Sequence, residues 1–149
     1  MQGIRVAQLR FDVPLAAKFA VRGLQAAESL GRAGLIEQAR FQFTLSEVSA
    51  DNSEILDRNF QAFHLSLEAD LPDWGLAAGV LHRTAVVIPA GTEDDRFDEY
   101  VERFLNSVPP EEAGQRAVAL AAKALRIIYS KRPSHARYIH ALKIGRAHV

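Results

Sequence analysis

The chain has 149 residues, of which 48% are hydrophobic and 24% charged, and its 18 Lys and Arg residues balance 18 Asp and Glu. A chain of this length usually forms one compact domain and can bury a hydrophobic core without disulfide bonds. The absence of cysteine excludes disulfides, thiolate zinc sites, iron–sulfur clusters and cysteine nucleophiles, and suits a reducing compartment. Uncharged runs are far shorter than the roughly 18 residues of a membrane span, and no secretory signal is recognisable. We therefore expect a cytoplasmic protein that does not enter the membrane.

The last six residues, 144–149, look like the one-frame translation of a widely used sequencing-library adapter. Segments of this kind are set aside before the fold is considered, together with Lys143, whose codon would straddle the junction. We therefore expect one domain over residues 1–142, truncated at its C-terminus, and an adapter-derived tail over residues 143–149. The alternative is a short native tail that happens to match.

The first elements are a strand and a helix. Apolar and polar residues alternate over residues 7–13, which predicts a half-buried strand. Pro14 then opens a stretch whose apolar residues share one helical face, and Gly31 or Gly34 offers a left-handed stop. The pattern predicts a helix that ends near Gly34.

Three further strands are predicted in the middle of the chain. The alternation returns over residues 41–46 and, most clearly, over residues 63–71. Residues 81–88 are more evenly apolar, which favours a central strand. The turn-forming residues at 72–75 would join the last two strands in a hairpin.

Two helices are predicted to follow. A capping box at residues 92–95 begins the first, the pair Pro109 and Pro110 separates it from the second, and Pro133 ends the second. The predicted order is β-α-β-β-β-α-α, with no internal repeat. Because the predicted strands have one apolar face, we predict a two-layer α+β domain with a largely antiparallel four-stranded sheet and helices on one face.

The apolar sides of these elements are expected to share one core. Its predicted members are Leu15, Phe19, Phe41, Phe43, Phe63, Leu65, Leu67, Phe97, Phe104 and Leu125.

The polar side of the sheet holds the candidate catalytic residues His64, Glu68, Asp70 and His82. A hairpin centred on Gly75 would place Glu68 opposite His82, where the carboxylate would orient the imidazole and raise its basicity. The alternative is a cross-strand surface pair that only stabilises the hairpin. The cluster lacks a second well-placed histidine, so no metal site or cofactor is predicted.

Charge divides the C-terminal part of the chain. Residues 93–112 are strongly acidic, whereas residues from Ala113 onward contain no acid. The two predicted helices can simply complement each other. Alternatively, the basic residues bind an anion or an acidic partner; they are Arg116, Lys123, Arg126, Lys131, Arg132 and Arg137.

No motif identifies an activity. We expect a non-catalytic binding or assembly module that acts through its sheet face or its C-terminal helical hairpin, on a second copy or on another protein. One alternative is an enzyme or small-molecule binder that uses the polar sheet face around Glu68 and His82. Another is a protein whose basic C-terminal helix binds nucleic acid or an acidic partner.

Overall fold

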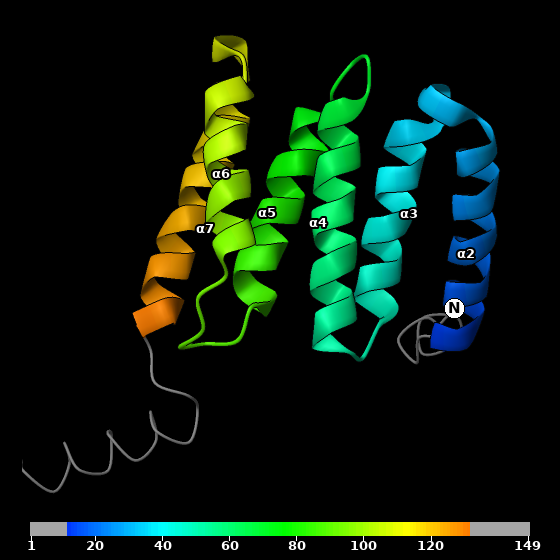
Figure 1. Ribbon diagram of the computed structural model, residues 1–149, viewed down its shortest axis with the longest axis horizontal. Coiled ribbons are helices and arrows are strands. Elements are labelled where there is room, and N and C mark those ends of the chain that lie inside the picture. The colour runs from blue at the N-terminus through cyan, green and yellow to red at the C-terminus, as the bar shows by residue number, and fades with distance from the viewer. Residues whose placement is uncertain (1–11, 132–149) are drawn as a thin grey trace, which may run out of the picture. The chain divides into compact units, whose positions relative to one another are not determined.

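The computed structural model describes residues 12–131, and within this range the chain forms helices and no strand (Figure 1). The predicted α+β domain with a four-stranded sheet is therefore wrong. The part of the first predicted strand up to residue 11 lies outside the described residues. The other three predicted strands fall within helices or the connections that follow them.

The chain divides into two compact units, residues 1–80 and 81–149. The described elements, in chain order, are α2 (Val13–Ser29), η1 (Gly31–Gly34), α3 (Leu35–Val48), α4 (Asn52–Glu68), α5 (Trp74–Val87), α6 (Asp95–Ser107), η2 (Pro110–Glu112) and α7 (Ala113–Lys131).

The elements recur along the chain as helix, short connection and helix. The connections within the pairs α2/α3, α4/α5 and α6/α7 span residues 30–34, 69–73 and 108–112, which is the same length each time. Each pair follows an aspartate whose carboxylate accepts hydrogen bonds from backbone N–H groups of the first turn; these N-caps are Asp12, Asp51 and Asp94. This regularity lies in element lengths and caps rather than in residue identities, and the absence of a sequence repeat stays a prediction.

The strand predictions failed because short alternating runs also fit a helical stripe. In α4, Phe63 and Leu67 continue a stripe that begins at Leu56 and Phe60, with the spacing i, i+4, i+7 and i+11. Phe60 and Phe63 are buried. Residues 41–46 lie in α3, and residues 81–87 lie in α5. Runs as short as these do not separate the two periods.

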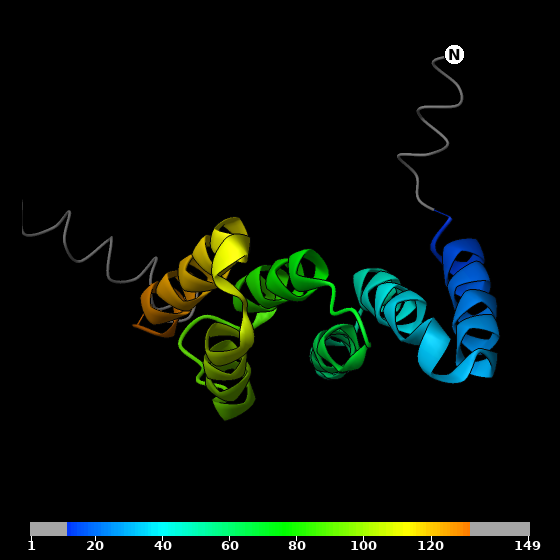
Figure 2. The ribbon, with the colours of Figure 1, turned by 90° about the horizontal axis from the view of Figure 1, so that it is seen from above.

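In the first unit, α3 lies between α2 and α4 (Figures 1 and 2). Close approach requires small residues in α2, because a Cβ added at Gly23 would overlap the ring of Phe41. The buried side chains of α2, α3 and α4 are Ala20, Ala27, Ala39, Leu45, Ser46, Asn59, Phe60, Ala62, Phe63, Leu65 and Ser66. Ion pairs join Arg32 of the α2–α3 connection to Asp70 (2.8 Å) and Arg40 of α3 to Asp73 (3.3 Å), both in the α4–α5 connection.

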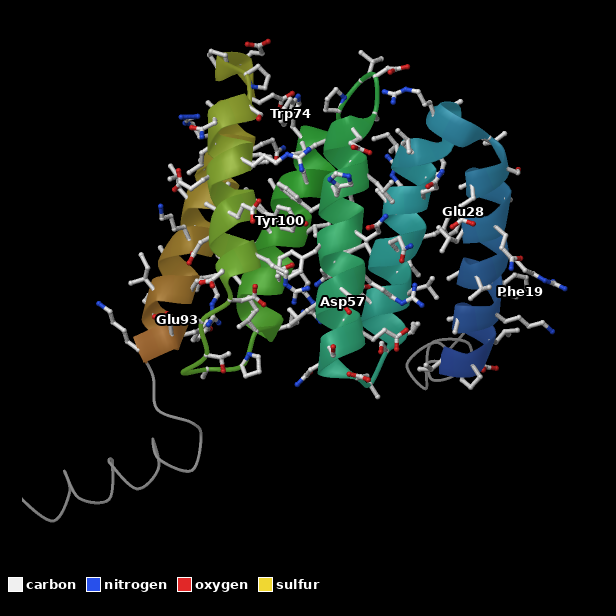
Figure 3. All side chains as sticks on the ribbon, in the orientation of Figure 1. Phe19, Glu28, Asp57, Trp74, Glu93 and Tyr100 are labelled. Carbon is white, nitrogen blue, oxygen red and sulfur yellow. The ribbon has the colours of Figure 1, made fainter. Side chains whose placement is uncertain are left out.

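Two residues predicted for the core are exposed instead. Leu15 and Phe19 are 46% and 60% exposed, and Figure 3 shows Phe19 projecting from α2 away from α3. They lie on a different face from Ala20 and Ala27, which the helix buries. Their helical spacing on the apolar face of this stretch predicted burial, but α2 contacts α3 through its small residues. Phe63, Leu65, Phe97 and Phe104 are buried as predicted.

In the second unit, α6 packs on α7 (Figure 1). The buried stripe of α6 is Phe97, Val101 and Phe104, at the spacing i, i+4 and i+7. From α7 the buried residues are Ala119, Ala122 and Arg126. The two helices predicted for this part of the chain are confirmed over the described residues.

Candidate functional site

A shallow cleft of about 420 Å³ lies between α6 and α7 within the second unit. The loop before α6 and the first turns of α6 supply Thr92, Glu93, Asp94, Phe97 and Asp98. The C-terminal half of α7 supplies Lys123, Arg126, Ile127, Ser130 and Lys131. Three of the six basic residues selected from the sequence therefore lie in this one place.

Arg126 forms the inner wall of the cleft and is only 6% exposed. Its Nη1 donates to the backbone carbonyls of Ala85 (3.3 Å) and Ile88 (3.0 Å), and its Nη2 donates to the carbonyl of Thr92. Burial lowers the pKa of Arg126, and nearby Asp94 partly opposes this. The guanidinium thus satisfies carbonyls at the end of α5 and in the α5–α6 loop. We conclude that Arg126 has a structural role in this position.

The α5–α6 loop is also tied to α7 through the backbone. Gly91 N–H donates to the carbonyl of Tyr129 at 2.8 Å. Gly91 has φ +77°, a left-handed conformation that suits glycine. Together with Arg126, this bond holds the loop against α7.

Two other cations of α7, Lys123 and Arg116, are engaged on the protein surface. Lys123 Nζ lies 2.8 Å from Glu102 Oε1, and this contact raises the pKa of Lys123. Arg116 Nη1 donates to the carbonyl of Leu105 at 3.0 Å. Lys131 is exposed at the end of α7. Arg132 and Arg137 lie outside the described residues.

The mixed charge of the cleft disfavours an anionic ligand. An anion beside Lys123 or Lys131 would also approach the carboxylates of Glu93, Asp94 and Asp98, which line the same cleft. The hydroxyl of Ser130 donates to the carbonyl of Ile127 at 3.1 Å, as in an ordinary helix. Nothing in this lining resembles a nucleophile with its base.

A second surface adjoins the cleft on the outer side of α7. It consists of uncharged side chains that are all exposed, and we call it the α7 outer face: Ala113, Ala117, Leu120, Ala121, Ala124, Ile127 and Ile128. Leu120, Ile127 and Ile128 are each about half exposed, at 49%, 50% and 50%. A helix that is apolar on both sides is normally covered on both sides.

The outer faces of α3 and α6 are different, and α2, which also exposes Leu15 and Phe19, interrupts them with the exposed charges of Lys18 and Arg22. Exposed positions of α3 include Glu37, Arg40 and Glu47, and those of α6 include Glu99 and Glu102. The charged residues of α7 that adjoin this face are Arg116 near its start and Lys131 at its end. This surface was not predicted from the sequence, because Arg126 was assigned to a partner-binding surface, which requires an exposed side chain. Its signal was present in the helical spacing of Ala117, Leu120, Ala124 and Ile127.

The predicted catalytic cluster does not form on a sheet. His64 and Glu68 lie one turn apart on α4, with Nε2 and Oε1 3.1 Å apart. Asp70 pairs with Arg32 instead. The predicted Glu68–His82 pair depended on a hairpin that the described residues do not contain, and His82 is an exposed residue of α5. The enzyme hypothesis therefore loses the geometry on which it rested.

Within residues 12–131, no group of three or more histidine or carboxylate side chains could hold a metal ion. None of the helices in this range combines the length and the apolar character needed to cross a membrane. In comparisons with known proteins, no family model, curated protein or solved structure matches the chain.

Proposed function

We propose that the protein is a non-catalytic binding or assembly module that acts through its C-terminal helical hairpin, α6 and α7. The observation that carries the proposal is the exposed apolar surface of the α7 outer face. Contiguous exposed apolar surface on a folded protein is typical of an interaction site. Leu120, Ile127 and Ile128 supply its large side chains.

The surroundings of this surface suit protein binding better than catalysis or nucleic-acid binding. Arg116, Lys123 and Arg126 all bond to acceptors within the protein. Nucleic-acid binding depends on cations that are available to phosphates. In contrast, the small alanine side chains on the exposed face of α7 would allow an apolar partner surface to pack closely against the helix.

The test compares the wild-type chain with the triple variant L120S/I127S/I128S as immobilised baits for proteins of a cell extract. Val86→Ser is the matched control, because Val86 is 45% exposed but lies on α5. We expect the wild type and the control to retain a protein, either more of the same chain or another one, that the triple variant does not retain. Equal retention by all three baits would contradict the proposal.

A further inference from the structure

We propose that the α7 outer face binds the same face of a second copy, with the two α7 helices antiparallel. The inference rests on the proposed function and names its partner. It follows from two properties of the face, the alternation of large and small residues and the charges at its two ends, and the area of the face sets the strength of the contact.

Large and small side chains on α7 complement one another when two copies run in opposite directions. If the pairing is centred midway between Leu120 and Ala124, Leu120 faces Ala124 of the second copy. The same register places Ile127 opposite Ala117 of the second copy. Leu120 and Ile127 then each meet an alanine, which allows close helix packing, while Ile128 lies opposite Arg116. In a parallel pair, Leu120 would face Leu120 and alanine would face alanine.

Charges at the two ends of α7 favour the same orientation. In this register Lys131 lies opposite Ala113, next to the exposed Glu111 that precedes the helix. The pair of opposite charges occurs twice because the arrangement is symmetric. The helix dipoles are also opposed, so each basic end lies beside an acidic start. A parallel pair would instead bring Lys131 against Lys131.

The area of the face sets the strength of the contact. A helix of 19 residues is about 28 Å long. With a width of about 10 Å, it offers roughly 300 Å² per copy, which is less than half of the roughly 800 Å² per partner in a standard interface. The dimer should therefore be reversible and should dissociate on dilution.

Cysteine cross-linking tests the orientation directly, because the natural chain has no cysteine. The variants Ala117→Cys and Ile127→Cys are oxidised mildly, alone and as an equimolar mixture. Glu47→Cys, at an exposed position of α3, is the control for random collisions. We expect the mixed Ala117–Ile127 disulfide to exceed either symmetric product several-fold. Symmetric products in excess would overturn the antiparallel pairing, and yields equal to the control would overturn the dimer.

Sedimentation velocity of the unmodified chain over a wide concentration range separates this inference from the proposed function. We expect the average mass to rise towards that of a dimer. The variant Ile127→Asp should weaken association by about tenfold or more, because it places a charge in the apolar contact. A chain that stays monomeric throughout would overturn the dimer. If its bait still retained another protein through the α7 outer face, the proposed function would survive.

Discussion

Replacement of Arg126 by alanine should lower the free energy of unfolding by about 3–5 kcal/mol. The wild-type side chain makes three hydrogen bonds to backbone carbonyls from a buried, charged donor. Each bond of this kind contributes about 1.5–3 kcal/mol, so the upper limit for three is roughly 5–9 kcal/mol. The cost of burying the guanidinium offsets part of this gain. The truncation also leaves the carbonyls of Ala85, Ile88 and Thr92 without their donor.

Urea unfolding followed by circular dichroism measures this loss. Arg116→Ala is the matched control, because Arg116 is exposed and makes one bond, to the carbonyl of Leu105. It should cost less than about 1 kcal/mol. Arg126→Lys should fall between the two, because an ammonium lacks the planar fork of donors. A loss below about 1 kcal/mol for Arg126→Ala would refute a structural role for this residue.

Four further substitutions test the packing and the electrostatics of the first unit and of α7. Asn59→Ala should raise stability by about 1 kcal/mol, because both polar atoms of the buried Asn59 amide lack a hydrogen-bond partner among the described residues; a lower melting temperature would contradict this. Gly34→Ala should destabilise, since a Cβ there would overlap the carbonyl of Ala27, whereas Gly114→Ala meets open space and should stabilise by about 0.5–1 kcal/mol; equal effects in calorimetry would argue against this packing. Hydrogen bonds from Arg58 and Ser49 hold the pKa of Glu54 below its ordinary value, so its stabilising effect is present near neutral pH and is lost as the pH falls through that lowered pKa. The difference in urea midpoint between wild type and Glu54→Gln should therefore shrink in acid, and a constant difference would count against the ion pair.

The positions of helix ends were easier to predict from the sequence than whether the elements in the middle of the chain are helices or strands. Proline residues mark helix boundaries by local chemistry. Helix α2 begins at Val13, next to Pro14, and the Pro109–Pro110 pair lies between the end of α6 at Ser107 and the start of α7 at Ala113. The alternating residues 63–67 have no such marker. Their helical character depends on residues upstream, such as Leu56 and Phe60, that complete the stripe.

Burial could not be assigned from residue type alone. Arg126 is charged and buried because three carbonyls, distant in sequence, surround its donors. Phe19 is aromatic and exposed because α2 contacts α3 through its small residues. Both outcomes depend on how helices pack, which a single sequence does not specify. The α7 outer face was overlooked for the same reason, since its existence follows from the inward direction of Arg126.

Hydroxyl-radical footprinting of the full chain at low and high concentration is the most direct measurement of the α7 outer face as an association surface. The radicals label exposed Leu and Ile side chains in solution. We predict that labelling of Leu120, Ile127 and Ile128 falls as concentration rises, while labelling of Leu15 and Val86 on α2 and α5 stays constant. Unchanged labelling of the three α7 residues at every concentration would contradict self-association through this face.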